Sequence, residues 1–320
     1  NEQAALTAMH TLFVREHNRL ARLLRFFRPH LSGDEIYARA RRIVGAEMQA
    51  ITFNEFLPLL LGKGALTPYA GYDPAVDAGI SNLFSTASYR FGHSLLSEQL
   101  LRLRKNGKPI AAGHLPLRDA FFAPARITDE GGIAPLLRGL AKQRCQEVDT
   151  KVVDAVRNFL FGPPGAGGFD LAALNIQRGR DHGLPGYNQT RVALGLAPVA
   201  SFQEITSDDA LADALEALYG DVNDVDVWVG GLAEDHLPGA MVGELVFTVL
   251  KDQFERLRDG DRFWYERAFS KPMRAWLSQT RLSHVIRRNT ASGRRIQKNV
   301  FVVKQRHGRD HDGDSDSGRR

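Results

Sequence analysis

The chain has very little cysteine, since Cys145 is the single example among its 320 residues. No internal disulfide can form, and the redox compartment in which the protein works stays open. A lone thiol more often packs as a small apolar side chain than acts as a nucleophile. We therefore expect Cys145 to be buried and chemically unremarkable.

Long apolar runs and a strong charge excess are also lacking. The longest apolar runs, such as residues 57–61, are far too short to cross a bilayer. The formal net charge is +5 and the sequence pI is about 9.4, which argues only weakly for anionic partners and does not indicate nucleic acid. The glycine-rich stretch at 162–168 lacks the Gly-Lys-Ser/Thr of a phosphate-binding loop. The chain begins with Asn1 and shows no signal peptide, so we expect a processed protein or a portion of a longer one.

Alternating strand patterns are scarce, whereas helical periodicity is common, so we predict a mainly α fold. Ser32 is a good N-cap for a second helix, and Pro58 should kink or end that helix. We predict a loop at residues 62–79, and residues 300–303 are the one predicted strand. A domain over 1–305 should precede a polar tail at 306–320 that is disordered on composition. The predicted helices span 4–27, 33–57, 76–105, 133–143, 147–161, 169–180, 208–219, 239–257, 260–269 and 271–279.

One histidine lies in a segment suited to a flat ligand. His93 stands in the segment SYRFGHSLL, residues 88–96. Gly92 removes a side chain beside the histidine, and Arg90 lies one helical turn back, within reach of an anionic group. The alternative is a structural histidine in the core with one satisfied hydrogen bond. The segment alone does not decide between a ligand-binding and a structural histidine.

A second segment, LNIQRGRDHGLPGYN at 174–188, gathers charged and amide side chains that are costly to bury unpaired. Such density indicates a polar network or an anion site, with a surface loop as the alternative. The preceding residues 171–174 look buried. His182 falls inside this segment, and we assign it a structural role.

These segments strongly resemble the animal-type haem peroxidases, the family of myeloperoxidase, thyroid peroxidase and the peroxinectins. LNIQRGRDHGLPGYN resembles the longest motif of that family, and YRFGHSLL resembles its proximal-histidine helix. MHTLFVREHNRLA, EGGIAPLLRGL, DVWVGGLAE and RLRDGDRFWYE follow in the family's order and extend the resemblance over residues 2–303. Six ordered motifs are far more specific than one short pattern.

The resemblance implies roles for particular residues. His93 matches the proximal ligand of haem iron, and Asn175 matches the amide that accepts a hydrogen bond from its Nδ1–H. A neutral amide leaves the imidazole less anionic than an aspartate would, which raises the reduction potential. Arg90 and Arg178 match residues beside the haem propionates. Glu2 matches a glutamate that forms an ester with a haem methyl.

The same resemblance implies haem b, and reduction of hydrogen peroxide through an oxoferryl intermediate that oxidises a halide or a small organic, often phenolic, donor. Gln3 occupies the place of a methionine that forms a sulfonium bond in myeloperoxidase, so that bond should be absent. We expect the distal histidine and arginine, and most of a Ca²⁺ site, to precede residue 1, supplied by an upstream segment or a partner chain. Secretion is expected from the family. The alternatives are a non-enzymatic haem-binding or adhesion module and a general basic-surface binder.

Internal side chains offer no substitute for the distal pair. His10 and His17 are seven residues apart on one helix, too far to chelate, and should be packed or hydrogen-bonded. Trp228, Trp264 and Trp276 are expected in the core rather than in a radical relay.

Overall fold

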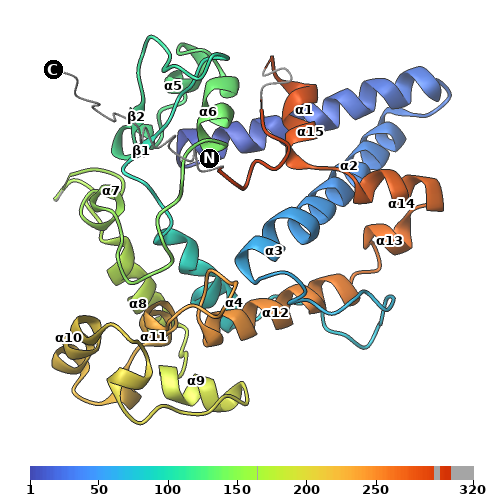
Figure 1. Ribbon diagram of the computed structural model, residues 1–320. Helices are drawn as coiled ribbons and strands as arrows, with labels where there is room; N and C mark the ends of the chain where they lie inside the picture. Colours follow the sequence, from blue (N-terminus) through green and yellow to red (C-terminus); the bar gives the residue numbers. More distant parts are fainter. Residues whose placement is uncertain (164, 292–295, 304–320) are drawn as a thin grey trace, which may run out of the picture.

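The fold begins with two long helices that pack together (Figure 1). The computed structural model describes residues 1–163, 165–291 and 296–303. Helix α1 spans Ala4–Phe27 and α2 spans Gly33–Ile51. Ser32 begins α2 with a capping box, in which its hydroxyl accepts from the amide of Glu35 and the Glu35 carboxylate accepts from the amide of Ser32. Both helices and the Ser32 cap are therefore confirmed.

The end of α2 changes its winding before Pro58. Residues Thr52–Phe56 form a π-helical turn, η1, and α3 follows over Leu57–Leu60. Pro58 lies in the first turn of α3, where its missing N–H costs no helical hydrogen bond. The helical run continues past Pro58 to Leu60, so the proline does not end it, and the predicted kink stays a prediction.

The predicted long helix over 76–105 is wrong. Helix α4 covers only Asn82–Thr86, because Ser81 caps it at its first turn and Ala87 leaves the helical region with φ −126° and ψ −72°. A 3₁₀ helix, η2, then spans Ser88–His93. The chain continues as the short strand β1, Gln99–Leu100, which pairs antiparallel with β2, Leu115–Pro116. Tertiary pairing has overridden the helical periodicity.

The other elements complete a mainly helical fold, as predicted. They are η3 (Leu117–Ala120), α5 (Ala125–Thr128), α6 (Ile133–Leu140), α7 (Asp154–Arg157), α8 (Leu171–Asp181), α9 (Tyr187–Ala193), η4 (Phe202–Glu204), α10 (Asp209–Tyr219), η5 (Val222–Asp224), α11 (Val227–Ala233), α12 (Glu244–Asp259), α13 (Tyr265–Ala268), α14 (Lys271–Ser278) and α15 (Leu282–Asn289).

Several of these elements differ from the predictions. Only α7 forms within the predicted helix 147–161, and α13 is far shorter than the predicted helix 260–269. Residues 300–303 form no strand, so that prediction is wrong. The helices α5, α9, α11 and α15 had not been predicted.

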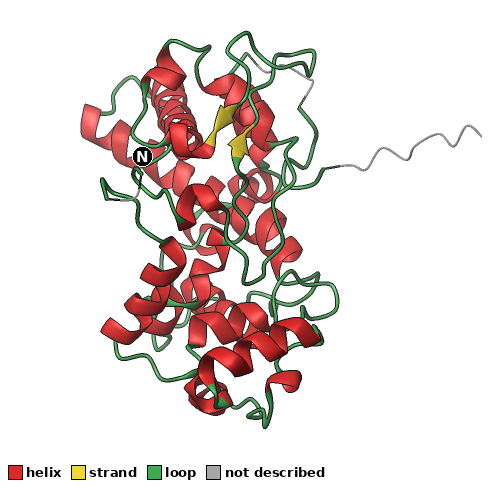
Figure 2. Cartoon of the chain, turned by 90° about the vertical axis from the view of Figure 1, so that its left-hand side faces the viewer, coloured by secondary structure: helices red, strands yellow, loops and turns green. Residues whose placement is uncertain are grey.

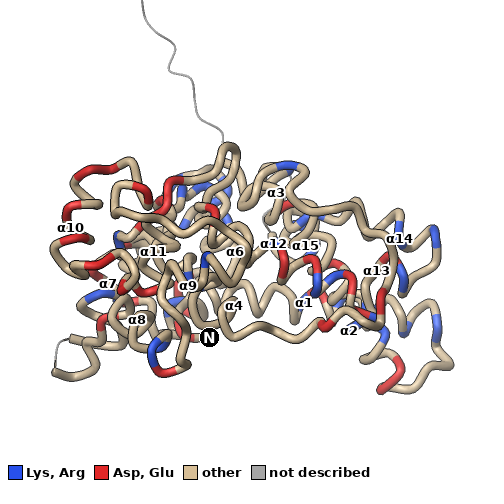
Figure 3. The backbone as a smooth tube through the Cα atoms, turned by 90° about the horizontal axis from the view of Figure 1, so that it is seen from below, with Lys and Arg blue, Asp and Glu red and all other residues tan. Residues whose placement is uncertain are grey.

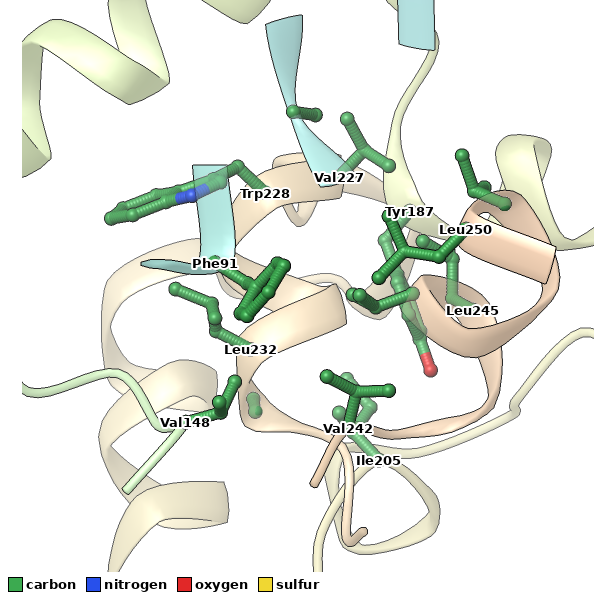
Figure 4. Packing of buried hydrophobic residues seen from close by; sticks show 14 of the residues in the cluster. Phe91, Val148, Tyr187, Ile205, Val227, Trp228, Leu232, Val242, Leu245 and Leu250 are labelled. Atoms are coloured by element: carbon green, nitrogen blue, oxygen red, sulfur yellow. The ribbon is translucent and has the colours of Figure 1, made fainter. Parts of the chain in front are cut away.

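The helices pack around separate apolar clusters. One cluster joins α1, α6 and α15 with the strands, and Figure 2 shows these strands in the same half of the molecule as the N-terminus. A second and larger cluster joins η2, α9, α10, α11 and α12. Phe91 of η2 lies in this second cluster with Trp228, Leu232 and Tyr187 (Figure 4). Because η2 is anchored there, the larger core determines where His93 stands.

The burial expected for Cys145 and Trp276 is not found. Cys145 is exposed. Trp276 is 40% exposed, whereas Trp228 and Trp264 are buried as expected. The tail predicted at 306–320 lies outside the described residues. None of the described helices combines the length and the apolar composition that a membrane-spanning helix requires.

Candidate active site

His93 is the last residue of the 3₁₀ helix η2, and aromatic side chains pack against one side of this helix. Phe91 is 3% exposed, and Tyr89 stacks on Phe84 with 4.6 Å between ring centroids. Phe254 of α12 meets both of these rings edge-on. Aromatic packing on one side of η2 fixes its backbone. His93 itself remains half-buried.

Asn175 reaches His93 from helix α8. Asp170 caps this helix by accepting hydrogen bonds from the amides of Ala172 and Ala173. The Asn175 side chain is fully buried, and its Nδ2 lies 2.8 Å from Nδ1 of His93. The two segments singled out in the sequence therefore meet here, across a separation of 82 residues.

Arg90 completes this group and orients the amide. Its Nη1 donates to Oδ1 of Asn175 at 3.0 Å, and its Nε donates to the carbonyl of Ser85 at 3.1 Å. With Oδ1 engaged by a cation, the amide nitrogen of Asn175 faces His93 and donates to Nδ1. This is the reverse of the expected direction, in which Nδ1–H donates to the amide. Sequence reasoning placed Arg90 near the ligand but missed its bond to Asn175, which no spacing pattern reveals.

The amide orientation constrains what His93 can bind. As the amide lies, Nδ1 accepts and the ring proton sits on Nε2. An Nε2 that ligates iron carries no proton, so the ring proton must then be on Nδ1. Oδ1 of Asn175 must accept the hydrogen bond from this Nδ1–H. Arg90 would have to leave Oδ1 for the amide to turn, because Nδ2 and the guanidinium are both donors.

Burial and charge favour a neutral imidazole. Burial is the main cause that lowers the pKa of His93, and the nearby charge of Arg90 lowers it further. Burial also lowers the pKa of Arg90, with a contribution from the charge of Arg178. Arg178 itself is exposed. Arg90 thus stands near His93, and a second cation, Arg178, stands near Arg90.

These residues fit haem. Haem needs one axial histidine from this side, and His93 supplies a neutral ring. A Cβ added at Gly92 would meet no atom within 4 Å, so open space adjoins the histidine. The two arginines offer charge-assisted partners for carboxylates at the edge of a ligand. Across the described residues, no group of three or more His, Cys, Asp or Glu side chains could hold a metal ion by itself.

Glu2 and Gln3 belong to a different part of the fold. The carbonyl of Glu2 accepts from the amide of Phe122 at 2.7 Å, and its exposed carboxylate shares no hydrogen bond with the His93 group in the described structure. The side chain of Gln3 caps α1 by accepting from the amide of Ala5. The ester role of Glu2 stays a prediction.

The other polar side chains of the segment 174–188 form a polar network. This is one of the two interpretations that their density indicated, the other being an anion site. Arg180 pairs with Asp226 of α11 through two hydrogen bonds, at 2.9 and 2.7 Å. His182 Nδ1 contacts Oδ1 of Asn82 at 2.9 Å, which ties the end of α8 to α4. Leu174 is 39% exposed, so the expectation of a buried lead-in at 171–174 is wrong.

Sequence reasoning also missed a buried ion pair behind the motif. Arg191 of α9 donates to Glu234 at 2.6 Å, and the hydroxyl of Tyr187 donates to the same carboxylate at 2.8 Å. A Cβ at Gly230 would approach the Tyr187 ring to 2.3 Å, so α9 and α11 are in close contact. The spacing of Tyr187 and Arg191 on one helical face was the available signal.

Comparison with known proteins now decides the family. The sequence pattern described as animal haem peroxidase matches residues 1–301. The chain belongs to this family. It is 44% identical to the peroxidasin homolog of Mus musculus, covering 95% of this chain and 21% of that protein. It is 45% identical to the eosinophil peroxidase of Mus musculus, covering 91% of this chain and 42% of that protein.

Solved structures agree with this membership. Peroxidase A of Dictyostelium discoideum matches with a TM-score of 0.88 and 40% identity, covering 94% of this chain and 58% of that chain. The fatty acid alpha-dioxygenase of Oryza sativa matches with a TM-score of 0.80 at 23% identity, which shows a shared fold. The chain spans between about a fifth and three fifths of the length of these relatives.

Proposed function

We propose that this chain forms the proximal half of a haem peroxidase that reduces hydrogen peroxide and oxidises a halide or a small organic donor. The contact between His93 and the buried Asn175 is the observation that carries the proposal. Haem b, when bound, would supply the redox chemistry by taking two oxidising equivalents from hydrogen peroxide and passing them to the donor.

His93 would hold the iron through Nε2, and Asn175 would fix the tautomer of its ring. Arg90 would move its charge from Oδ1 of Asn175 to a propionate, which frees the amide to accept from Nδ1–H. Arg178, which already influences the pKa of Arg90, would hold the same edge of the ligand. A neutral amide partner leaves the imidazole a weaker donor to iron than a carboxylate partner would.

We further propose that the histidine and arginine that act on the peroxide come from outside residues 1–320. Three of the described histidines have partners away from His93. His10 contacts Asn1, and His236 contacts the carbonyl of Val148. His17 lies against Tyr37, and their ring centroids are 5.0 Å apart. An ester through Glu2, a Ca²⁺ site and secretion remain parts of this proposal.

Peroxide-dependent oxidation of a phenolic dye tests the function. Two proteins are compared after loading with haemin: the 320-residue chain, and the same chain extended at its N-terminus by a segment that carries a distal histidine and arginine. We expect turnover in the extended protein and its loss in the His93→Ala variant. Equal turnover with and without His93 would contradict the proposal. If the extended protein binds haem but does not oxidise the dye, the non-enzymatic haem-binding alternative is favoured.

A further inference from the structure

The small net charge hides a strong separation of charge along the chain. Residues 192–250 contain no lysine or arginine, whereas residues 262–289 contain a single carboxylate, Glu266. Figure 3 shows acidic segments along α10 at one end and basic segments around α13 and α14 at the other. The acidic stretch carries Glu204, Asp208, Asp209, Asp213, Glu216, Asp221, Asp224, Asp226, Glu234, Asp235 and Glu244, and the basic stretch carries Arg262, Arg267, Lys271, Arg274, Arg281, Arg287 and Arg288.

At the basic end, three arginines line one open cavity of about 630 Å³. Arg42 comes from α2, Arg267 from α13, and Arg262 from the turn that joins α12 to α13. Phe263 and Ala268 form the remaining wall. The three guanidinium groups come from segments about 220 residues apart in sequence, so the fold gathers them.

Backbone carbonyls and aromatic rings hold these guanidinium groups in place. Arg42 Nη2 donates to the carbonyl of Ala268 at 2.6 Å, and Arg267 Nη1 donates to the carbonyl of Arg262 at 2.8 Å. Arg262 lies over the ring of Phe263, 4.7 Å from its centroid. A guanidinium has five N–H donors, so each group keeps several for a ligand.

The neighbouring carboxylates do not neutralise this cluster. Within the described structure, none of the three arginines forms an ion pair with a carboxylate. Asp261 accepts from the amide of Phe263 and from Gln49, and Glu266 accepts from the indole of Trp264. Cations held close together without a counterion raise one another's energy, which an oxyanion would relieve.

We propose that this cavity binds a phosphate or sulfate monoester. Guanidinium groups match the geometry of such oxyanions and bind them through paired N–H donors. The ring of Phe263 is 57% exposed at the wall and offers an apolar surface to the carbon skeleton that carries the ester. The shared chemistry is the charged ester group, whether it belongs to a small molecule or to a sulfated polysaccharide.

Isothermal titration calorimetry of the 320-residue chain tests the proposal, with inorganic phosphate, phenyl phosphate and a sulfated tetrasaccharide as probes. We expect saturable binding that is tighter for phenyl phosphate than for inorganic phosphate. The double variant R42Q/R267Q should weaken it at least about tenfold, which corresponds to roughly 1.4 kcal/mol. The single variant R262Q should weaken it less. Arg42 and Arg267 are exposed, so we expect the double variant to fold, and far-UV circular dichroism checks this.

The matched control is R104Q, which removes one exposed arginine that does not line the cavity. Unchanged affinity in R104Q together with the loss in R42Q/R267Q supports the site. Tighter binding of the tetrasaccharide with the same dependence on the variants would identify a polysaccharide as the source of the ester. Absence of saturable heat with every probe, or equal weakening by R104Q, would overturn the proposal. None of these readouts requires haem, so the outcome is independent of the peroxidase proposal.

Discussion

His93, Asn175 and Arg90 form one unit in which each side chain decides the state of the next. Arg90 fixes the amide of Asn175, and the amide decides which ring nitrogen of His93 carries the proton. The unit can therefore be perturbed one residue at a time, and each change has its own signature.

Replacement of Asn175 by aspartate should lower the reduction potential of bound haem. A carboxylate accepts the Nδ1 proton more strongly and makes the imidazole a stronger donor, which stabilises ferric iron. We expect a decrease of at least about 60 mV, a tenfold change for a one-electron couple. Spectroelectrochemical titration measures it, with Asn175→Gln as the neutral control. An unchanged potential in Asn175→Asp would show that the amide does not act on the ligand.

Removal of the Arg90 charge should raise the pKa of His93 in the haem-free chain. The pKa is depressed first by burial and then by Arg90. A cationic imidazole costs less once the guanidinium is gone, so Arg90→Gln should titrate at higher pH than the wild type. An NMR titration of the His93 ring protons measures both values. A lower pKa in Arg90→Gln would mean that the hydrogen-bond rearrangement outweighs the lost charge.

At the scale of elements, the sequence predicted those whose signals are local. Helix α1 and the Ser32 cap follow from apolar spacing and capping chemistry, which neighbouring residues determine. The prediction of one helix over 76–105 failed because the apolar residues of this stretch also suit a chain that pairs with residues 115–116 and supports α6. Periodicity alone cannot distinguish a helix from a segment packed on several sides.

Helix α6 depends on one glycine where it meets strand β1. A Cβ at Gly139 would lie 1.6 Å from the carbonyl oxygen of Leu101, so the backbone would have to move. We expect Gly139→Ala to destabilise the chain by about 3 kcal/mol. Gly45→Ala is the matched control in α2, where a Cβ meets nothing within 4 Å, and it should stabilise by roughly 0.5–1 kcal/mol. Urea denaturation measures both, and similar effects from the two variants would contradict this packing.

The contact between His93 and Asn175 could be anticipated from the sequence only through the family resemblance. Residues 82 positions apart carry no local signal of proximity. The direction of the amide could not be anticipated, because it depends on where Arg90 settles in three dimensions. The arginine cavity is also beyond sequence reasoning, since Arg42 and Arg267 meet only after α2 packs against α13.

At the scale of the whole molecule, a buried carboxylate pair should make stability depend on pH. Glu16 and Glu47 are both fully buried, and Arg288 bridges them at 2.9 and 2.7 Å. Burial raises the pKa of Glu47 to about 7, and the charge of Glu16 adds to this. The hydrogen bonds from Arg19 and Asn289 help to hold the pKa of Glu16 below its usual range, although burial opposes them. Below a pH of about 7, the pair therefore holds one proton, which the raised pKa assigns to Glu47.

The sign follows from the raised pKa of Glu47. Unfolding releases that proton while the pH lies between the ordinary value of 4.5 and about 7, so stability should fall as pH rises through this window. The contribution is on the order of 3 kcal/mol, at about 1.4 kcal/mol per pKa unit. Glu47→Gln should flatten this decline. Urea denaturation between pH 5 and 8 measures it, and an equal slope in both proteins would refute the assignment.

Haemin titration of the chain, followed at the Soret band, tests the central claim most directly. We predict a saturable spectrum typical of histidine-ligated ferric haem in the wild type, its loss in His93→Ala, and its return when imidazole is added to that variant. His10→Ala serves as the control, because His10 contacts Asn1 and lies outside the site. A wild-type spectrum in His93→Ala without imidazole would contradict the assignment of His93 as the proximal ligand.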